Sequence, residues 1–475
     1  MSFRANLFSS KNHHNSLFQG HFFVPRLVNP HGGGKLKPLL LEGAALAEEQ
    51  THAQHRVRVA VSSRESTAAR LIASIVLPHP PMGYATSKKC SLPMHRTMLP
   101  RYLVLSLILL GSFFSHFPLP ARAQPVISQE HTFRVVKIVE GLEHPWGLAF
   151  LPDGRMLVTE RPGRLRILKD GKLDPQAVAG LPQITEYGQG GLLDVALHPR
   201  FSENSLVYLS YAARGEGGVG TEVARGKLTG NRLENVQVIF RQQPKGTTGR
   251  HFGSRLVFDR EGYLYITLGD RGEQDRAQKP DDHAGSVIRL HDDGRVPKDN
   301  PFVGKAGWKP EKYTLGNRNM QGAALHPQTG MLWTHEHGPQ GGDEINVIRA
   351  GVNYGWPVIT YGAEYVIGTK IGEGTHKPGM AQPIRYWVPS IAPSGMAFYT
   401  GDKFPRWRGD LFIGALRDQM LVRLKLDGEK IVKEERMLQG VLGRIRDVRN
   451  GPDGYLYLLT DASNGVLARL EPADR

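Results

Sequence analysis

Cysteine is nearly absent from this sequence: Cys90 is the only one among 475 residues. From residue 124 onward the chain therefore has no disulfide bond, no thiolate metal site, no catalytic thiol and no Cys-x-x-Cys-His haem attachment. Without disulfides the fold must rely on its hydrophobic core, for which a hydrophobic fraction of 40% is ample.

Aspartate is missing from residues 1–123, which hold 14 Lys and Arg, four Glu and nine of the 19 His. That segment carries +10 of the chain's net charge of +15, so the remainder carries only +5. The charge balance therefore does not indicate a nucleic-acid-binding protein. A Gly-x-x-x-x-Gly-Lys-Ser/Thr loop is absent too, which disfavours nucleotide ligands.

The apolar run at residues 103–114 is too short to span a membrane comfortably. Two arginines precede it, and an Ala-Arg-Ala sequence ending at Ala123 offers a cleavage site. We expect residues 94–123 to be a signal peptide, cut near Ala123, that sends the chain to the periplasm or out of the cell and leaves no membrane span in the mature protein. Residues 1–93 are then expected to be a disordered, non-native extension from a start codon assigned too far upstream.

Long amphipathic helical patterns are absent from the rest of the chain, which shows short apolar runs joined by turns rich in Pro, Asp and Gly. This unit recurs at residues 148–168, 194–212, 256–272, 323–338, 397–426 and 447–470. Six copies, spaced roughly 50–70 residues apart, predict an all-β, six-bladed β-propeller with four-stranded antiparallel blades over residues 124–475. Two β-sandwiches in tandem are the competing all-β arrangement.

Polar loops between these repeats should converge at the mouth of the propeller channel, where ligands bind. They are residues 186–191, 248–253, 269–271, 316–319, 336–339, 414–418 and 443–446. Each loop offers glycine for close approach and one or two polar side chains.

One pair in these loops could carry acid–base chemistry. His251 precedes one expected strand, and Asp270 ends the next. A carboxylate bonded to one ring nitrogen fixes the tautomer and makes the other nitrogen a better base. The alternative is a structural histidine.

Charged side chains in other loops indicate ligands. Four arginines, Arg318, Arg417, Arg444 and Arg446, would repel one another at one channel mouth unless an anion were there, which predicts a small polyanionic ligand. Asp343, Glu344 and nearby carbonyls offer the hard oxygen ligands that calcium prefers over zinc. The alternative for both groups is solvated charge on hairpin loops.

Several segments together resemble one known family: GQGGLLDVALHP, GRHFGSRLVF, YITLGDRG, GNRNMQG, EHGPQGGDEINVI, NYGWP, GALRD and GRIRDVRNGPDG. They look like the soluble, pyrroloquinoline quinone (PQQ)-dependent aldose sugar dehydrogenases, six-bladed periplasmic propellers of the soluble glucose dehydrogenase type. The resemblance covers about residues 134–472, in the family's order. It implies oxidation of the C1 hydroxyl of an aldose to the lactone by hydride transfer to PQQ, with calcium and an unidentified electron acceptor such as a quinone, a cytochrome or a dye.

The resemblance also implies roles for individual residues. His251 would be the general base, oriented by Asp270, and Arg318 with Asn319 would address the quinone carbonyls. The other implied residues are Gln189, Tyr365, Leu416, Arg417, Asp418, Arg444 and Arg446 for the cofactor, Gly338 and Pro339 for calcium at the quinone, and Glu344 and Tyr354 for a further calcium.

Two residues depart from the family pattern: Arg417 stands where Lys is expected, and His337 where the glucose dehydrogenase branch has Gln. The first puts one cofactor contact in doubt because Arg and Lys differ in hydrogen-bond geometry. The second places the chain in the broader aldose branch. Two rival functions remain at this stage: a propeller that binds sugar, peptide or protein without chemistry, and a calcium-dependent propeller lactonase.

Overall fold

The computed structural model describes residues 124–365 and 368–473. The expected signal peptide (residues 94–123) and upstream extension (residues 1–93) lie outside these residues. Within the described part, no helix has the length and apolar character needed to cross a membrane.

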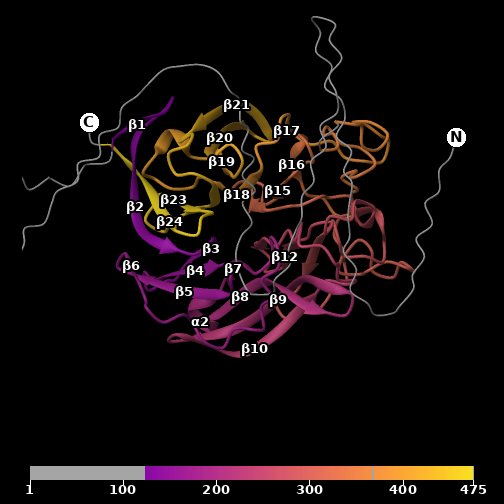
Figure 1. Cartoon of the computed structure of the whole chain (residues 1–475), viewed down its shortest axis with the longest axis horizontal. Helices are drawn as coiled ribbons and strands as arrows, with labels where there is room; N and C mark the ends of the chain where they lie inside the picture. The colour runs from indigo at the N-terminus through magenta and orange to yellow at the C-terminus, as the bar shows by residue number, and fades with distance from the viewer. Residues whose placement is uncertain (1–123, 366–367, 474–475) are drawn as a thin grey trace, which may run out of the picture. The chain divides into compact units, whose positions relative to one another are not determined.

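The described chain is built almost entirely from strands, which form six antiparallel sheets (Figure 1). The first three are β3 (Pro145–Phe150), β4 (Met156–Glu160), β5 (Arg164–Lys169) and β6 (Lys172–Leu173); β7 (Leu192–Leu197), β8 (Leu206–Gly215), β9 (Gly218–Thr229) and β10 (Arg232–Arg241); and β11 (Leu256–Phe258), β12 (Leu264–Thr267) and β13 (Val287–Leu290). Helical turns are limited to α2 (Phe201–Asn204), η1 (Gln274–Gln278) and η2 (Pro405–Trp407) in the described residues.

The other three sheets complete a ring. They are β14 (Gly322–Leu325), β15 (Leu332–Glu336), β16 (Asp343–Val347) and β17 (Arg385–Trp387); β18 (Pro393–Phe398), β19 (Leu411–Ala415), β20 (Met420–Asp427) and β21 (Lys430–Met437); and β22 (Ile445–Asn450), β23 (Leu456–Thr460) and β24 (Gly465–Pro472) with β2 (Thr132–Leu142) and β1 (Val126–Ile127). The first strand of each blade contacts the next in the order β3, β7, β11, β14, β18, β22 and back to β3.

The six-bladed propeller expected from the sequence is confirmed, and each repeat covers all or part of the first two strands of one blade. Aspartate side chains form the connecting turns locally: Asp259 Oδ1 accepts the amide of Tyr263 at 2.8 Å, and Asp453 Oδ1 accepts that of Tyr455 at 3.2 Å. The third blade has three strands, and its outer position is reduced to an isolated bridge between Ile288 and Lys312.

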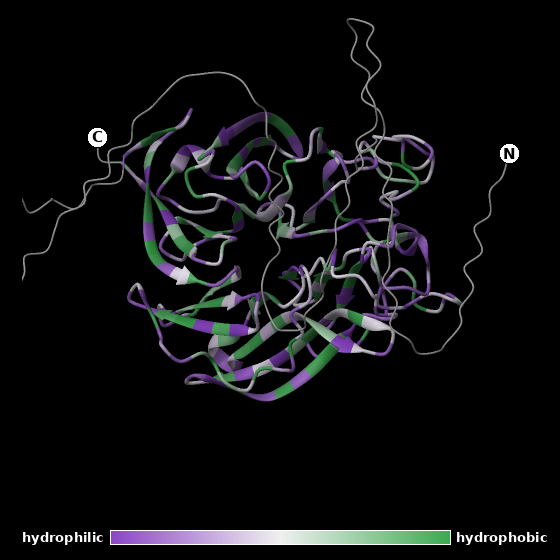
Figure 2. Ribbon diagram, in the orientation of Figure 1, coloured by the Kyte–Doolittle hydropathy of each residue, from purple (hydrophilic) through white to green (hydrophobic). Residues whose placement is uncertain are grey.

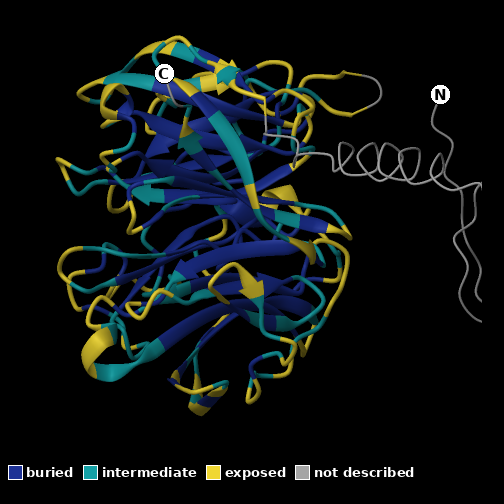
Figure 3. Ribbon diagram, turned by 90° about the vertical axis from the view of Figure 1, so that its left-hand side faces the viewer, coloured by how far each residue is buried: buried dark blue, intermediate teal, exposed yellow. Residues whose placement is uncertain are grey.

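The hydrophobic cores lie between neighbouring blades, so each sheet buries both faces. Leu157 and Leu165 of the first blade pack with Leu192 and Leu209 of the second. Figure 2 shows apolar and polar positions alternating along the strands, and Figure 3 shows the buried residues inside the ring with exposed residues in the connections. Packing on both faces holds the strand ends rigidly, and these ends carry the polar loops.

Antiparallel pairing places the start of each first strand and the end of each second strand on the same side of the propeller. His251 precedes β11, Asp270 follows β12, and Arg318 precedes β14. The sequence-predicted residues therefore share one end of the ring. Close packing there requires glycine at Gly269, where a Cβ would lie 2.2 Å from the His251 carbonyl oxygen.

Candidate active site

His251 and Asp270 form the centre of the site. Nδ1 of His251 lies 2.6 Å from Oδ1 of Asp270, whose side chain is almost completely buried. Because an ionised carboxylate only accepts hydrogen bonds, Nδ1 carries the proton and Nε2 keeps its lone pair. Burial lowers the pKa of His251 against the opposing effect of Asp270, so the imidazole is neutral at pH 7. A neutral ring with a free Nε2 is equipped to accept a proton.

Two further donors hold Asp270. Nε1 of Trp356 donates to Oδ2 at 2.8 Å, and the amide of Gly272 donates to Oδ1 at 2.7 Å. Burial would raise the pKa of Asp270, yet the hydrogen bond and charge of His251, with the charge of Arg318, keep it below its ordinary value. Asp270 therefore remains a carboxylate that can orient the imidazole.

The backbone at His251 adopts a left-handed conformation, with φ of 53°. Its amide donates to Oε1 of Gln189 at 2.9 Å, which connects the second blade to the third at this point. A non-glycine residue in this region is uncommon and is found preferentially at functional sites, where the surroundings maintain it. Gln189 thus contacts the proposed base directly.

Arg318 and Asn319 lie beside this pair. Nη1 of Arg318 donates to the carbonyl oxygens of His337 at 3.0 Å and Gly338 at 2.8 Å, and its guanidinium carbon lies 5.1 Å from the centre of the Trp356 ring. Nε of Arg318 and Nδ2 of Asn319 are buried and have no acceptor within the described residues. Two buried donors without acceptors fit a ligand that carries oxygen acceptors.

A second cluster lies at the ends of the sixth and first blades. Asp461 accepts from Arg446 at 2.7 Å, from Arg444 at 3.1 Å, and lies 3.0 Å from His144 Nδ1. Burial opposes it, but Arg446, His144 and Arg444 hold the pKa of Asp461 far below its usual range. The expectation that only an external anion could separate these arginines was therefore incomplete, because Asp461 lies between them. Nη1 of Arg444 also donates to the Leu416 carbonyl at 3.3 Å.

The remaining cofactor candidates share no hydrogen bond with these clusters among the described residues. Arg417 is exposed and donates to the carbonyl of Ser390 at 2.6 Å, and Asp418 next to it is half-buried. Tyr365 is 56% exposed on the long connection between β16 and β17. No contact in the described chain joins Tyr365 to His251 or to the arginines.

The expected metal ligands divide into two groups. Glu344 of β16 is paired across the sheet with Glu336 of β15, and both are buried. Burial, aided by Glu336, raises the pKa of Glu344 well above its ordinary value, and that of Glu336 is raised to about 7. Two adjacent buried carboxyl groups with Asn346 as shared donor fit a cation between them. Tyr354 lies on the connection after β16 and is buried.

Gly338 and Pro339 are less available. The Gly338 carbonyl accepts from Arg318, so a cation there would have to replace the guanidinium. Asp343, which the sequence suggested as a further oxygen ligand, is occupied: its carboxylate accepts the amides of Gly338 at 2.8 Å and Ile391 at 2.7 Å. No group of three His, Cys, Asp or Glu in the described residues is arranged to hold a metal.

Sequence reasoning missed Trp356 and Asp461 as parts of the site. The sequence contained a signal for each. Trp356 belongs to the NYGWP segment, and Asp461 follows β23 at the same end of the ring as the other loops. Trp356 pairs with Asp270 across 86 residues, which no local pattern identifies, whereas Asp461 lies only 15 and 17 residues from Arg446 and Arg444 in the same blade.

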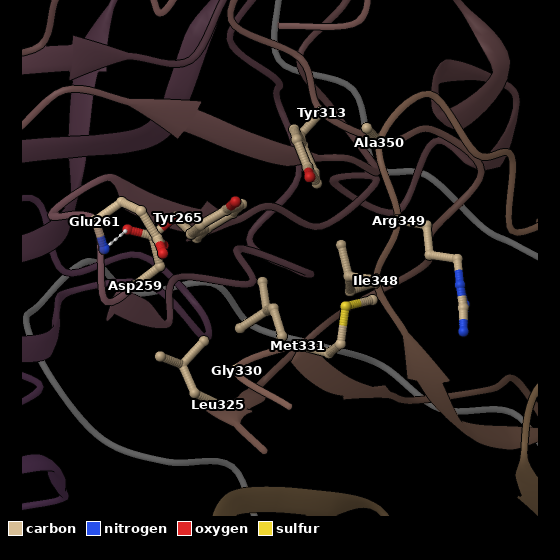
Figure 4. A pocket seen from close by; sticks show the side chains of 11 residues that line it. Asp259, Glu261, Tyr265, Tyr313, Leu325, Gly330, Met331, Ile348, Arg349 and Ala350 are labelled. Carbon is tan, nitrogen blue, oxygen red and sulfur yellow. Dashed lines mark hydrogen bonds between the residues drawn. The ribbon is translucent and has the colours of Figure 1, made fainter. Parts of the chain in front are cut away.

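A cavity of about 250 Å³ lies away from this site (Figure 4). It is lined by Asp259, Glu261, Tyr265, Tyr313, Met331 and Arg349, among others. Asp259 occupies the turn at the opposite ends of β11 and β12 from His251 and Asp270. The cavity therefore belongs to the other face of the propeller.

Comparison with known proteins agrees with this geometry. A family model described as Glucose / Sorbosone dehydrogenase matches residues 142–469. Aldose sugar dehydrogenase YliI of Escherichia coli (strain K12) is 46% identical over 367 residues, which cover 76% of this chain and 98% of that protein. A crystal structure of glucose dehydrogenase is 52% identical and covers 71% of this chain and 99% of its own, with a TM-score of 0.70.

A more distant solved structure is the PQQ-bound form of aldose sugar dehydrogenase from Streptomyces coelicolor. It is 27% identical and covers 74% of this chain and 99% of its own, with a TM-score of 0.58. The family match extends from the end of β2 to β24 and includes every strand that surrounds the site. The chain is therefore an enzyme of the Glucose / Sorbosone dehydrogenase family.

Proposed function

We propose that this enzyme oxidises the C1 hydroxyl group of an aldose to the lactone, with bound PQQ as the oxidant and His251 as the general base. The observation that carries the proposal is the buried His251–Asp270 pair, with Nε2 left free, beside buried donors that lack acceptors. The relatives named for sugar dehydrogenase activity support the substrate class.

The residues present fit a cofactor rich in oxygen acceptors. Nε of Arg318 and Nδ2 of Asn319 need acceptors, and Arg444 and Arg446 could meet carboxylates in addition to Asp461. The PQQ-bound relative supports this identity. When bound, PQQ supplies an electron-poor quinone that takes up two electrons as a hydride.

The role of the chain is to place and deprotonate the sugar. Nε2 of His251 accepts the proton of the C1 hydroxyl, and Asp270 stabilises the imidazolium that forms. As the hydrogen on C1 leaves with its electron pair, the C1–O bond becomes a carbonyl, which is the lactone. Arg318, buried beside Trp356, offers positive charge where negative charge develops on the oxidant.

We assign calcium two roles, near the oxidant at Gly338 and Pro339 and in the fold at Glu344 and Tyr354. The buried Glu336–Glu344 pair supports the second role most directly, because a divalent cation would offset two neighbouring buried carboxylates. The first requires Arg318 to give up its bond to Gly338. An ion there would polarise the oxidant.

We also propose that the enzyme acts in the periplasm or outside the cell, after cleavage near Ala123. The signal-peptide pattern of residues 94–123 supports this. N-terminal sequencing of exported protein should begin at Gln124. A mature chain that begins before residue 94 would contradict both the export route and the upstream-extension hypothesis.

Two rivals have less support. A binding module without chemistry has no need of a histidine whose ring is paired with a buried carboxylate that stabilises its protonated form, as at His251. A lactonase would need a metal held by several carboxylate and amide side chains in the channel, and it would leave Arg318, Arg444 and Arg446 without a role.

The deciding experiment is to add PQQ and calcium to the purified protein and follow the quinone absorbance on adding an aldose. We expect bleaching of the oxidised band and one lactone per cofactor reduced. The matched control is a 1,5-anhydro sugar, which has no C1 hydroxyl and should leave the spectrum unchanged. Bound PQQ that no aldose reduces would overturn the proposed function.

A further inference from the structure

One histidine of the site has no role in the chemistry described above. His337 follows β15 directly, between the buried residues Glu336 and Gly338, but its own side chain is only partly buried. Its carbonyl oxygen accepts from Arg318 at 3.0 Å. The residue therefore lies on the wall of the site, one hydrogen bond away from Arg318.

The His337 ring is held in one tautomer. Its Nε2 contacts the carbonyl oxygen of Pro393, the first residue of β18 in the next blade. A carbonyl oxygen can only accept, so Nε2 carries the proton and Nδ1 carries the lone pair. This arrangement is the reverse of that at His251, where Nδ1 is protonated and Nε2 is free.

The lone pair of Nδ1 is available to a ligand. Nδ1 of His337 has no hydrogen-bond donor among residues 124–365 and 368–473. It is also not among the buried polar atoms that lack a partner, unlike Nδ1 of His335 two residues earlier on the same strand face. An acceptor that is accessible, fixed in orientation and next to Arg318 is suited to receive a hydroxyl proton donor.

We propose that Nδ1 of His337 accepts a hydrogen bond from a hydroxyl group of the bound sugar, other than the one that His251 deprotonates. The inference rests on the proposed sugar oxidation and deepens it, by assigning a residue that positions the substrate. A sugar offers several hydroxyl donors around one ring, so a second fixed acceptor selects the orientation in which C1 faces His251.

Two isosteric substitutions separate the proposed role of Nδ1, which accepts from the sugar, from that of Nε2, which donates to the Pro393 carbonyl. In His337→Asn the amide oxygen replaces Nδ1, so the acceptor is kept and the bond to Pro393 is lost. In His337→Gln the amide nitrogen reaches the position of Nε2, so the bond to Pro393 is kept and the acceptor is lost. His337→Gln should raise KM for the preferred aldose about threefold to tenfold, the range of one hydrogen bond. Its kcat should change by less than about twofold.

His337→Asn should keep the KM of the wild type but lower the melting temperature, because the contact between the fourth and fifth blades is gone. A series of monodeoxy aldoses gives the second measurement. One analogue should bind the wild type about threefold to tenfold more weakly than the parent sugar does, and this difference should vanish in His337→Gln.

The outcomes are decisive in both directions. Equal changes of KM in His337→Asn and His337→Gln would overturn the assignment. So would a series of deoxy sugars that ranks identically in the wild type and in His337→Gln. His337 would then only hold the two blades together through Pro393. Calorimetric titration with the same sugars separates this from the proposed function. If the wild type binds aldoses through His337 but does not oxidise them, the proposed redox reaction is refuted and the role of His337 is retained. If the wild type oxidises aldoses and His337→Gln binds them with unchanged affinity, the reaction is retained and the role of His337 is refuted.

Discussion

At the scale of single residues, the hydrogen bond from His251 to Asp270 decides which ring nitrogen can act as a base. His251→Ala should lower kcat about 10²–10⁴-fold, the usual contribution of a general base. Affinity for PQQ, measured by fluorescence titration, should stay nearly unchanged, because the donors assigned to the cofactor are on other loops. Near-normal turnover in a folded, cofactor-loaded variant would remove His251 from the mechanism.

The hydrogen bond from Trp356 to Asp270 predicts the direction in which the pKa of His251 shifts when that bond is removed. Trp356→Phe keeps a ring beneath Arg318 but removes the donor to Asp270 Oδ2. The carboxylate then becomes more basic and favours the imidazolium, so the pKa of His251 should rise. Because His251 must be neutral to accept a proton, the acidic limb of the kcat/KM profile should move to higher pH.

The matched variant is Asp270→Asn, which removes the negative charge that raises the pKa of His251 and replaces the carboxylate by a neutral amide. Its acidic limb should move to lower pH, with a lower plateau because the tautomer is no longer controlled. Shifts of the same sign in Trp356→Phe and Asp270→Asn would contradict the assigned hydrogen bonds.

At the scale of elements, the first strands of three blades meet through a buried ionic network. Arg255, just before β11, reaches Asp194 of β7 at 3.1 Å and Asp447 of β22 at 3.0 Å. Its guanidinium carbon lies 4.1 Å from the centre of the Trp146 ring. Arg449 contacts the same two carboxylates at 2.7 and 2.8 Å. The network thus links β7, β11 and β22, which belong to three different sheets.

Removing one of the two arginines of this network, Arg255, should lower the free energy of unfolding of the propeller. Arg255→Met leaves two buried carboxylates with one arginine, and breaking a buried pair costs about 3–5 kcal/mol. Urea unfolding should show a lower midpoint. The control is Arg200→Met, whose partner Glu203 is 3.6 Å away and exposed, and whose loss should be undetectable. Equal stability of Arg255→Met and wild type would show that Arg449 suffices.

At the scale of the whole molecule, one strand pairing closes the ring of blades, and one acidic pair is buried inside the fourth blade. β2 pairs with β24, the last described strand, so the beginning and the end of the propeller share one blade. The Glu336–Glu344 pair lies in the interior of the fourth blade. If calcium has both proposed roles, chelation should abolish activity through the site at Gly338 and Pro339 and lower the melting temperature through the site at Glu344, and added calcium should restore both.

Glu344→Gln separates calcium binding from simple charge repulsion. With calcium, the variant should melt at a lower temperature than the wild type, because a ligand of the ion is lost. Without calcium, the variant should melt at a higher temperature than the wild type, because the repulsion between two neighbouring buried carboxyl groups is removed. A higher melting temperature in the presence of calcium would refute the site at Glu344.

The amino-acid sequence by itself determined the number of blades and the end of the ring at which the site lies. Both follow from local patterns: alternating apolar positions specify strands, and Asp259 and Asp453 form their turns with amides a few residues away. Since antiparallel strands alternate in direction, residues at strand starts and ends could be assigned to one face. His251 and Asp270, 19 residues apart in one blade, were paired correctly on that basis.

Only the tertiary structure decided which partners these residues have. Trp356 donates to Asp270 across 86 residues, and Arg255 pairs with Asp194 across 61. Asp461 neutralises two arginines that the sequence left without an anion, and Asp343 is consumed by backbone amides rather than available as a ligand. The contacts of Trp356, Arg255 and Asp343 depend on how neighbouring blades pack, which the periodicity of a single strand does not predict. Asp461 lies in the same blade as Arg444 and Arg446, 17 and 15 residues away, and only the fold shows that its buried carboxylate pairs with both.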